Sequence, residues 1–172
     1  MTKRRAVGDD QEPQIRPTAN YRKRQLEGLF AMDDTVKTQG TNNARTPGAK
    51  RAGPGEYYFD MTKVNSIMGG PAYSSVFGGC VEGDRMIAAL MRMPAGTGSE
   101  PHSHPNEQWV YVLEGTMDST VNGHRHLAGP GSAIYIPADT IHYAKATMER
   151  DVIFFTVKDA SHGLHGVKAK SA

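Results

Sequence analysis

Two histidines separated by one residue are the clearest chemical feature of the sequence. His102 and His104 stand in the segment Pro-His-Ser-His-Pro. On an extended strand, side chains two residues apart point to the same face. Neutral imidazole is the commonest protein ligand for transition metals. The spacing therefore predicts a strand face on which two imidazoles can act together.

The residues after this pair include two further candidate ligands, Glu107 and Gln108. Alternation places Gln108 on the histidine face and Glu107 on the opposite face, with Trp109, Tyr111 and Leu113. A carboxylate is the stronger metal ligand, and a bulge at Pro105 would turn Glu107 inward. The residues alone leave the choice between Glu107 and Gln108 open.

The order and spacing of these residues resemble the first motif of the cupin superfamily. The motif begins at Gly96, continues after five intervening residues with His102 and His104, reaches Gln108 after three more intervening residues, and ends at Gly115. Its usual form has Glu at the position of Gln108. This departure removes one negative charge from the expected site.

A second segment resembles the second cupin motif. It contains Gly131, Pro137, Asp139 and His142 at the expected spacing and follows the first motif after 15 residues. Asp139 replaces a usual Gly, and Ala146 replaces a usual Asn. Because two separated motifs agree in spacing and residue type, the resemblance is specific, and it covers roughly Tyr57 to Lys158.

The cupin resemblance implies an all-β fold, a single jelly-roll barrel with one divalent transition metal inside. The ligands it implies are His102, His104, Gln108 and His142. This donor set favours Fe or Mn and also suits Ni, Zn or Cu, while the lack of thiolates disfavours a closed structural zinc site. A metal-free cupin is the alternative. A metal held by neutral ligands keeps its charge and favours an anionic ligand.

The function implied is a metal-dependent enzyme acting on a small organic molecule, an enol, phenol or carboxylate. A dioxygenase-type reaction is favoured. One alternative is a lyase, decarboxylase or isomerase that uses the metal as a Lewis acid. Another is a non-catalytic module that binds a small molecule or a metal. A helix-turn-helix regulator is disfavoured because residues 1–51 lack a three-helix apolar pattern.

Three residues outside the motifs are candidates for catalysis. Tyr135 and Tyr143 flank the second motif and can donate a hydrogen bond to a substrate oxygen, or pack with the hydroxyl at the surface. Arg92 can bind a carboxylate if its side of the strand faces the cavity, but a charge at the barrel rim is the preferred interpretation.

Other reactive residue types have simpler interpretations. His124 and His126 follow the turn signal Asn122-Gly123, so we expect them to be solvated. His162 and His165 are expected at the surface of the C-terminal tail, with a tail folded across the barrel mouth as the alternative. Cys80 is expected to be a small buried residue rather than a reactive thiol.

Composition limits the class of protein. The chain has 172 residues, 38% of them apolar and 22% charged, with a single Cys. Residues 1–51 contain 11 Lys and Arg against 6 Asp and Glu, and the remainder contains 9 against 12. Basic residues spread along a polar leader do not predict nucleic-acid binding. No apolar run approaches the roughly 18 residues of a membrane span. We expect a cytoplasmic protein in a reducing compartment.

Three regions are predicted along the chain: a polar, largely flexible N-terminal extension over residues 1–55, a barrel over 56–160 and a tail over 161–172. A short helix is possible at Tyr21–Met32. Alternating runs between turn residues predict eight strands. They are Tyr57–Met61, Tyr73–Val81, Met86–Met93, Gln108–Glu114, Met117–Val121, Ala133–Ile136, His142–Ala146 and Val152–Lys158.

The strand face opposite the histidines also predicts a partner. Trp109, Tyr111 and Leu113 would form an apolar stripe on the outside of a barrel. Exposed aromatic stripes usually pack against another surface, and cupin resemblance implies dimers built from sheet contacts. We therefore expect a homodimer that binds a small-molecule substrate, and neither nucleic acid nor a membrane.

Overall fold

The computed structural model describes residues 45–170. Regular structure in this part consists of β-strands, with no α-helix among the described residues, which confirms the predicted all-β class. No described helix could therefore cross a membrane. The possible helix at Tyr21–Met32 and most of the predicted extension lie outside the described residues.

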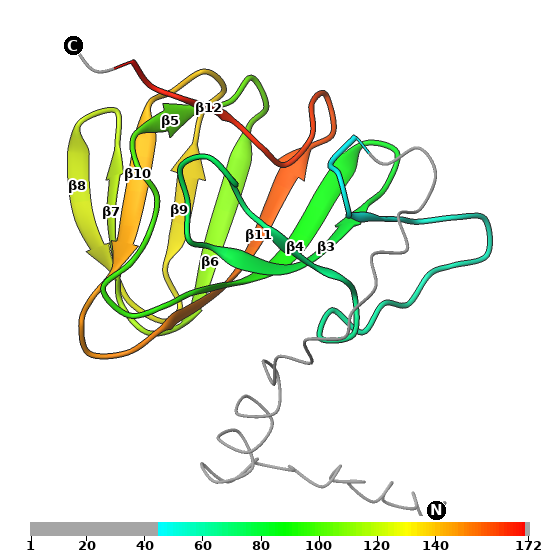
Figure 1. The fold of residues 1–172 in the computed structure, drawn as a ribbon, viewed down its shortest axis with the longest axis horizontal. Helices are drawn as coiled ribbons and strands as arrows, with labels where there is room; N and C mark the ends of the chain where they lie inside the picture. The colour runs from blue at the N-terminus through cyan, green and yellow to red at the C-terminus, as the bar shows by residue number, and fades with distance from the viewer. Residues whose placement is uncertain (1–44, 171–172) are drawn as a thin grey trace, which may run out of the picture. The chain divides into compact units, whose positions relative to one another are not determined.

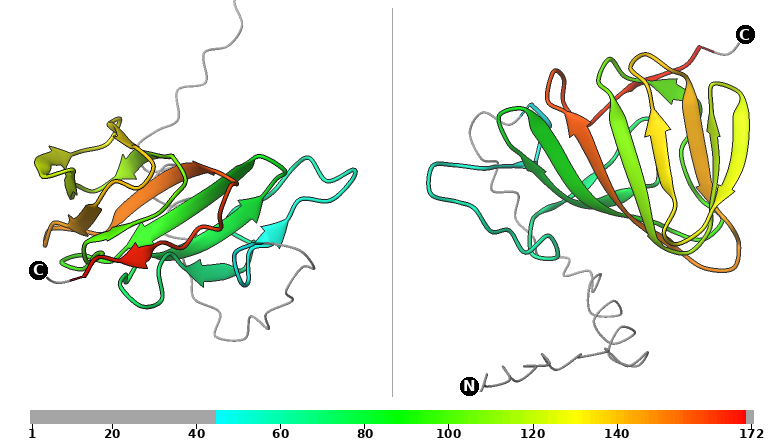
Figure 2. Two further views of the ribbon diagram at one scale, coloured as in Figure 1. Left: turned by 90° about the horizontal axis from the view of Figure 1, so that it is seen from above. Right: turned by 180° about the vertical axis from the view of Figure 1, so that it is seen from behind.

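The strands form two sheets (Figure 1). The larger sheet has the order β1 (Lys50–Arg51), β3 (Phe77–Glu82), β4 (Met86–Met93), β11 (Val152–Asp159), β6 (Gln108–Glu114) and β9 (Ala133–Ile136), with β2 (Ser66–Met68) paired to β3. The smaller sheet has the order β12 (Val167–Lys168), β5 (His102–Ser103), β10 (His142–Ala146), β7 (Met117–Val121) and β8 (His124–Ala128). Figure 2 shows the same strands from above and from behind.

Alternating burial in β4 and β6 shows that each of these strands has one face on the core. In β4, Ile87, Ala89, Met91 and Met93 are buried while the residues between them are partly or fully exposed. Val110 and Val112 of β6 are buried in the same way. Apolar side chains from both sheets form a single core cluster, so the barrel interior is lined from both sides.

Most predicted strands are confirmed. Those over Met86–Met93, Gln108–Glu114, Met117–Val121, Ala133–Ile136 and His142–Ala146 have the predicted bounds. The strand predicted at Tyr57–Met61 is wrong. Tyr57 and Tyr58 are 80% and 95% exposed, and the Asp60 carboxylate accepts hydrogen bonds from the backbone N–H and hydroxyl of Thr62, which makes a local turn.

The end of the predicted extension, residues 45–51, lies against the barrel. The buried carboxylate of Glu82 accepts hydrogen bonds from the backbone N–H groups of Arg45 and Thr46, at 2.7 and 2.9 Å, and from the Thr46 hydroxyl. β1 then pairs in parallel with β3. Sequence composition could not show this attachment because it depends on one buried acid 36 residues away.

The segment after β11 also packs on the barrel. Asn106 is fully buried, and its Nδ2 donates to the carbonyls of Asp159 and Gly163. The backbone N–H of Gly166 donates to the Tyr73 hydroxyl at 2.7 Å. β12 then pairs with β5, the strand that carries His102. The last described residues are therefore fixed beside the histidines.

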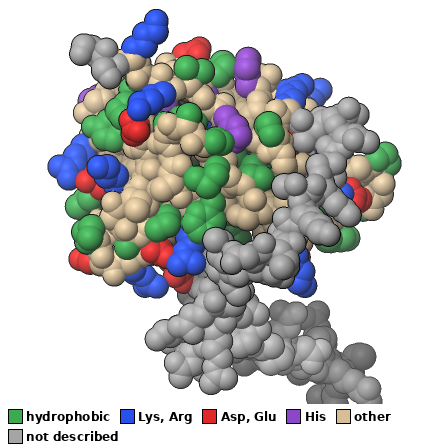
Figure 3. Space-filling model, viewed as in Figure 1, with side chains coloured by type: hydrophobic (Ala, Val, Ile, Leu, Met, Phe, Trp, Pro, Cys, Tyr) green, Lys and Arg blue, Asp and Glu red, His purple; other side chains and the backbone are tan. Residues whose placement is uncertain are grey.

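Charged side chains are dispersed over the surface. On the face seen in Figure 3, Lys and Arg alternate with Asp and Glu, mainly toward the margins, and hydrophobic or uncharged groups occupy the centre. Several of these charges are paired, such as Arg125 with Asp118 and Arg150 with Glu114. The described residues on this face form no continuous basic patch of the kind that binds a phosphate backbone.

Candidate metal centre

Three histidines from the two motifs meet inside the barrel. His102 of β5 and His142 of β10 are register partners in adjacent antiparallel strands, and their ring centroids are 4.1 Å apart. His104, just after β5, has its ring 4.8 Å from that of His142 and 6.2 Å from that of His102. All three side chains are buried. The structure thus brings together the three histidines singled out from the sequence.

In each of these three histidines, Nδ1 is the ring nitrogen that is hydrogen-bonded to the backbone. Every Nδ1 lies within hydrogen-bond distance of a backbone carbonyl, from Glu100 at 2.8 Å, Asn106 at 2.7 Å and Thr140 at 2.9 Å. A carbonyl oxygen only accepts, so each Nδ1 carries the proton and each Nε2 keeps a lone pair. Such contacts fix the tautomer of metal-binding histidines.

Gln108 contributes a fourth donor atom. Its Nε2 donates to the Thr156 hydroxyl at 2.8 Å, and that hydroxyl donates to the Trp109 carbonyl at 2.8 Å. These two hydrogen bonds orient the Gln108 amide so that its Oε1 lies 2.9 Å from Nε2 of His104. Glu107, the other candidate ligand, is exposed and accepts a hydrogen bond from the Tyr135 hydroxyl, so it is directed away from the histidines.

Burial keeps the three imidazoles neutral. It lowers the pKa of His102 to about 3, with a further contribution from the neighbouring His142. It lowers the pKa of His104 to about 4, helped by the positive charge of Lys158. The pKa of His142 is lowered for the same main reason, burial. Neutral imidazoles are the form that binds a metal.

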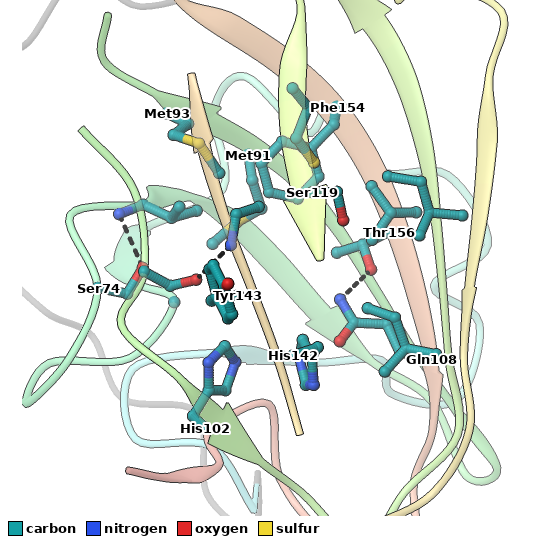
Figure 4. A pocket seen from close by; sticks show the side chains of 18 of the residues that line it. Ser74, Met91, Met93, His102, Gln108, Ser119, His142, Tyr143, Phe154 and Thr156 are labelled. Atoms are coloured by element: carbon teal, nitrogen blue, oxygen red, sulfur yellow. Dashed lines mark hydrogen bonds between the residues drawn. The ribbon is translucent and has the colours of Figure 1, made fainter. Parts of the chain in front are cut away.

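A cavity of about 90 Å³ adjoins these residues. His102, His142, Gln108 and Thr156 lie at one end of it (Figure 4). The other end is apolar and includes Met91, Met93 and Phe154. The cavity therefore has a polar end with donor atoms and an apolar end.

A surface groove provides the candidate route into this cavity. Its lining includes Pro71, Gly98 and Lys145. Four residues, Tyr73, Ser74, Ser99 and Tyr143, line both the groove and the cavity. A small molecule that enters by the groove would pass between the loop before β3 and strand β10.

Lys158 is the main residue at the cavity that sequence reasoning missed. Its side chain is 3% exposed, lines the cavity and donates to the Leu164 carbonyl at 2.7 Å. Burial lowers the pKa of Lys158 to about 7. A signal existed in the sequence, because Lys158 and Thr156 share parity with the buried Val152 and Phe154 of the same strand.

The three candidate catalytic residues lie in different places. Tyr143 lines both the cavity and the surface groove, and its side chain is 38% exposed because it alternates with the inward-facing His142 on β10. Tyr135 is on the outer face, where its ring lies 4.8 Å from that of Trp109. Arg92 is also on the outer side of β4, where its guanidinium pairs with Asp151. Tyr135 and Arg92 face away because they occupy the solvent-side parity of their strands, so neither can touch a molecule in the cavity.

The departure at Asp139 leaves the second motif intact. Asp139 has a φ of 58°, in the left-handed region that favours Gly but that Asp also tolerates. Its backbone N–H donates to the His104 carbonyl at 2.8 Å. The residue that replaces the usual Gly therefore still makes the turn, and it joins the loop before His142 to the segment that carries His104.

The remaining histidines and the cysteine lie outside the cavity. His124 and His126 are exposed on β8, next to the turn at Asn122 and Gly123. His162 is exposed, and His165 contacts the Met68 carbonyl. Cys80 is fully buried, and burial raises the pKa of its thiol to about 12.

Gln108 adds an amide oxygen to the three histidine nitrogens as a fourth donor atom. In the described part of the chain, no group of three or more His, Cys, Asp or Glu side chains has the arrangement of a metal site on its own. The three Nε2 atoms and the Gln108 Oε1 are all unprotonated acceptors. Neutral nitrogen and oxygen donors of this kind suit a divalent transition metal.

Comparisons with known proteins agree on the fold. Residues 89–158 match the family model described as Cupin domain. The polyketide cyclase RemF from Streptomyces resistomycificus is 22% identical, with a TM-score of 0.58 over 67% of this chain and 87% of that chain. A cupin-2 domain protein from Rhodospirillum rubrum, Rru_A2000, is 16% identical, with a TM-score of 0.56 over 67% of this chain and 80% of that one.

A third solved structure is similar over less of the chain. An RmlC-like cupin from Shewanella frigidimarina is 19% identical, with a TM-score of 0.50 over 60% of this chain and 88% of that chain. At these identities the likeness concerns the fold and not the reaction. The search of curated proteins gave no significant match to this chain.

Proposed function

This chain belongs to the cupin superfamily. We therefore propose that the protein is an enzyme acting on a small anionic organic molecule. Its barrel binds one divalent transition metal, Fe or Mn, in this proposal. The ligands are His102, His104, His142 and Gln108. Fe and Mn are favoured because the first candidate reaction needs a redox metal, and Ni, Zn and Cu, which the same donors also bind, are the alternatives.

One observation carries this proposal. The His104 Nε2 and the Gln108 Oε1 are 2.9 Å apart, and neither carries a hydrogen when the Nδ1 of His104 donates to the Asn106 carbonyl. Two facing lone pairs repel, and a cation that accepts both removes the repulsion. Protonation of His104 is a poor substitute because burial holds its pKa at about 4.

The residues of the cavity have separable roles in this proposal. A metal held there supplies Lewis acidity, and redox chemistry if it is iron or manganese. Thr156 orients the amide of Gln108, and the backbone carbonyls orient the imidazoles. Tyr143 lines both the groove and the cavity, but it is 38% exposed and alternates with the buried His142 on β10, so we assign its hydroxyl no role in the cavity. The apolar lining excludes water from the bound molecule.

A dioxygenase-type reaction is the first candidate. An all-neutral donor set accepts a chelating anion without accumulating negative charge. The second candidate is lyase, decarboxylase or isomerase chemistry, which the presence of Lys158 at the cavity favours because it adds a group that exchanges protons. A binding module without catalysis is the remaining alternative.

Elemental analysis of untagged protein tests the metal. We expect near-stoichiometric iron or manganese in the wild type and loss of the metal in His104→Ala. The control His124→Ala should keep the metal, because His124 is exposed on β8. Metal retained in His104→Ala and lost in His124→Ala would refute the ligand assignment. Oxygen consumption with enolic and phenolic acids then separates the dioxygenase from the lyase, which works without oxygen.

We also propose that the protein is a homodimer that associates through the outer face of the larger sheet. Five exposed large side chains form an outer apolar patch, Trp109, Tyr111 and Leu113 of β6, Tyr135 of β9 and Phe155 of β11. Register pairing places Tyr135 beside Trp109 and Phe155 beside Tyr111. Because β6 runs through the centre of the patch, a two-fold axis there would bury the same side chains from both copies.

A further inference from the structure

We infer that Lys158 is the residue that selects the ligand of this cavity, an organic acid whose acidic head pairs with the Lys158 ammonium and whose apolar body lies among Met91, Met93 and Phe154. The inference rests on the proposed function for the reaction but not for the binding. It assigns a role to a buried charge that the metal site does not use.

The Lys158 ammonium is unusual because it is buried without a counter-ion. Its Nζ donates to one carbonyl, that of Leu164. Among the described residues, no carboxylate lies within ion-pair distance of it. Buried lysines are rarely retained without a partner, and an ammonium can make three hydrogen bonds. Two of its three donor positions are thus available to a ligand.

The charge of the whole cavity agrees with this assignment. Among its lining residues in the described chain there is no Asp and no Glu. The ionisable groups that line it are His102, His142, Tyr73, Tyr143 and Lys158. An enclosed space with only basic or neutral groups attracts an anion, and a divalent metal at the histidines would strengthen the attraction.

Lys158 lies at the polar end of the cavity. Its backbone is the register partner of Gln108 across β11 and β6, and its charge contributes to the lowered pKa of His104. An acidic head placed here is therefore close to both the ammonium and the metal ligands. The same molecule can contact the ammonium with one oxygen and the metal position with another.

The opposite, apolar end of the cavity determines the apolar body of the ligand. Met91, Met93 and Phe154 are 2, 2 and 6% exposed, and they lie away from the histidines (Figure 4). Met117, Ile134 and Val110 extend the same lining. Burying a methylene group on such a surface favours binding by about fourfold, so affinity should rise with the size of the apolar body until the cavity is full.

Binding of straight-chain acids and their neutral amides tests the inference. Isothermal titration with butyrate, hexanoate, butyramide and hexanamide would be carried out on metal-free and metal-loaded protein. The variants are Lys158→Met, Lys158→Arg and the control Lys63→Met, whose lysine is 82% exposed on a loop. We expect the wild type to bind hexanoate more tightly than butyrate and at least tenfold more tightly than hexanamide.

Lys158→Met should lose about tenfold or more of its hexanoate affinity, while hexanamide binding is unchanged. Lys158→Arg keeps the preference for the acid, and Lys63→Met resembles the wild type. Equal losses for acid and amide, no loss in Lys158→Met, or no binding of any acid by the wild type would each overturn the inference. If Lys158→Met does not fold, the wild-type and Lys158→Arg comparisons decide.

The design keeps this inference separate from the metal proposal. An acid preference that depends on Lys158 in metal-free protein supports the inference even if no metal is ever bound. A stoichiometric metal with no acid preference overturns the inference and leaves the metal proposal standing.

Discussion

The Nε2 atom of His104 lies 2.9 Å from the Oε1 atom of Gln108, and the neighbours of both residues leave no proton between these atoms. This relationship depends on Thr156, whose hydroxyl donates to the Trp109 carbonyl and so accepts from the Gln108 amide. A residue on β11 thereby decides which atom of Gln108 faces the histidines. In a free amide the NH₂ group would turn toward His104 instead.

Thr156→Val should weaken metal binding without removing it. The substitution keeps the shape of the side chain but releases the Gln108 amide, and loss of such supporting contacts typically costs about 10- to 100-fold in metal affinity. Competition with a chelator of known affinity measures the change. The matched control is Thr147→Val, because the buried Thr147 hydroxyl has no hydrogen-bond partner among the described residues. Equal affinity in the two variants would contradict the role of Thr156.

Much of the fold and of the histidine cluster can be predicted from the sequence because strand parity fixes both. The spacing of His102 and His104 puts them on one face, and the second motif predicts that His142 lies on a neighbouring strand. Parity also places Trp109 outside and Gln108 inside without any knowledge of the structure. Placements of this kind follow from the alternation of side chains within one strand.

What the sequence could not supply are contacts between segments far apart in the chain. Asn106 attaches residues 159–163, and Glu82 attaches Thr46, through side chains whose partners are 36 to 57 positions away. The choice between the two faces of β4, which decides the position of Arg92, depends on which sheet covers it. The sequence does not single out Lys158, because a lysine at the end of a strand is usually exposed.

Cys80 should be inert in the folded protein. Burial raises the pKa of its thiol to about 12, and the Glu82 carboxylate contributes in the same direction. At pH 8 only about one thiol in ten thousand would be ionised, against roughly a quarter at the ordinary pKa. A thiol-specific chromogenic reagent should therefore react within minutes in denaturant but very slowly in buffer, and Cys80→Ser should abolish both signals. Rapid labelling of the native protein at pH 8 would show that Cys80 is accessible.

Lys158 should make stability depend on pH in the alkaline range. Its pKa is about 7 in the folded protein and 10.5 without burial, so between these values the unfolded chain binds more protons than the folded one. Stability therefore rises as the pH increases from about 7 toward 10.5, and the full penalty applies below pH 7.

Removing this charge should stabilise the barrel at neutral pH. We expect Lys158→Met to raise the free energy of unfolding by on the order of 1 kcal/mol at pH 7, after loss of the hydrogen bond to Leu164 is subtracted. The gain should shrink at pH 9.5. Urea unfolding of metal-free protein at the two pH values measures it, with Lys63→Met as the control. A gain that does not change with pH would point to packing rather than to the charge.

The outer apolar patch should hold two copies of the chain together. Trp109 is 47% exposed at its centre and is flanked by Tyr135, so Trp109→Glu places a charge where the two sheets would meet and should produce a monomer. Light scattering after size-exclusion chromatography would give about twice the 18.7 kDa chain mass for the wild type and the single mass for the variant. Leu127→Glu on β8, where Leu127 is 57% exposed on the other sheet, should remain dimeric. A monomeric wild type would show that this dimer does not form. A monomer from Leu127→Glu alone would place the interface on the smaller sheet.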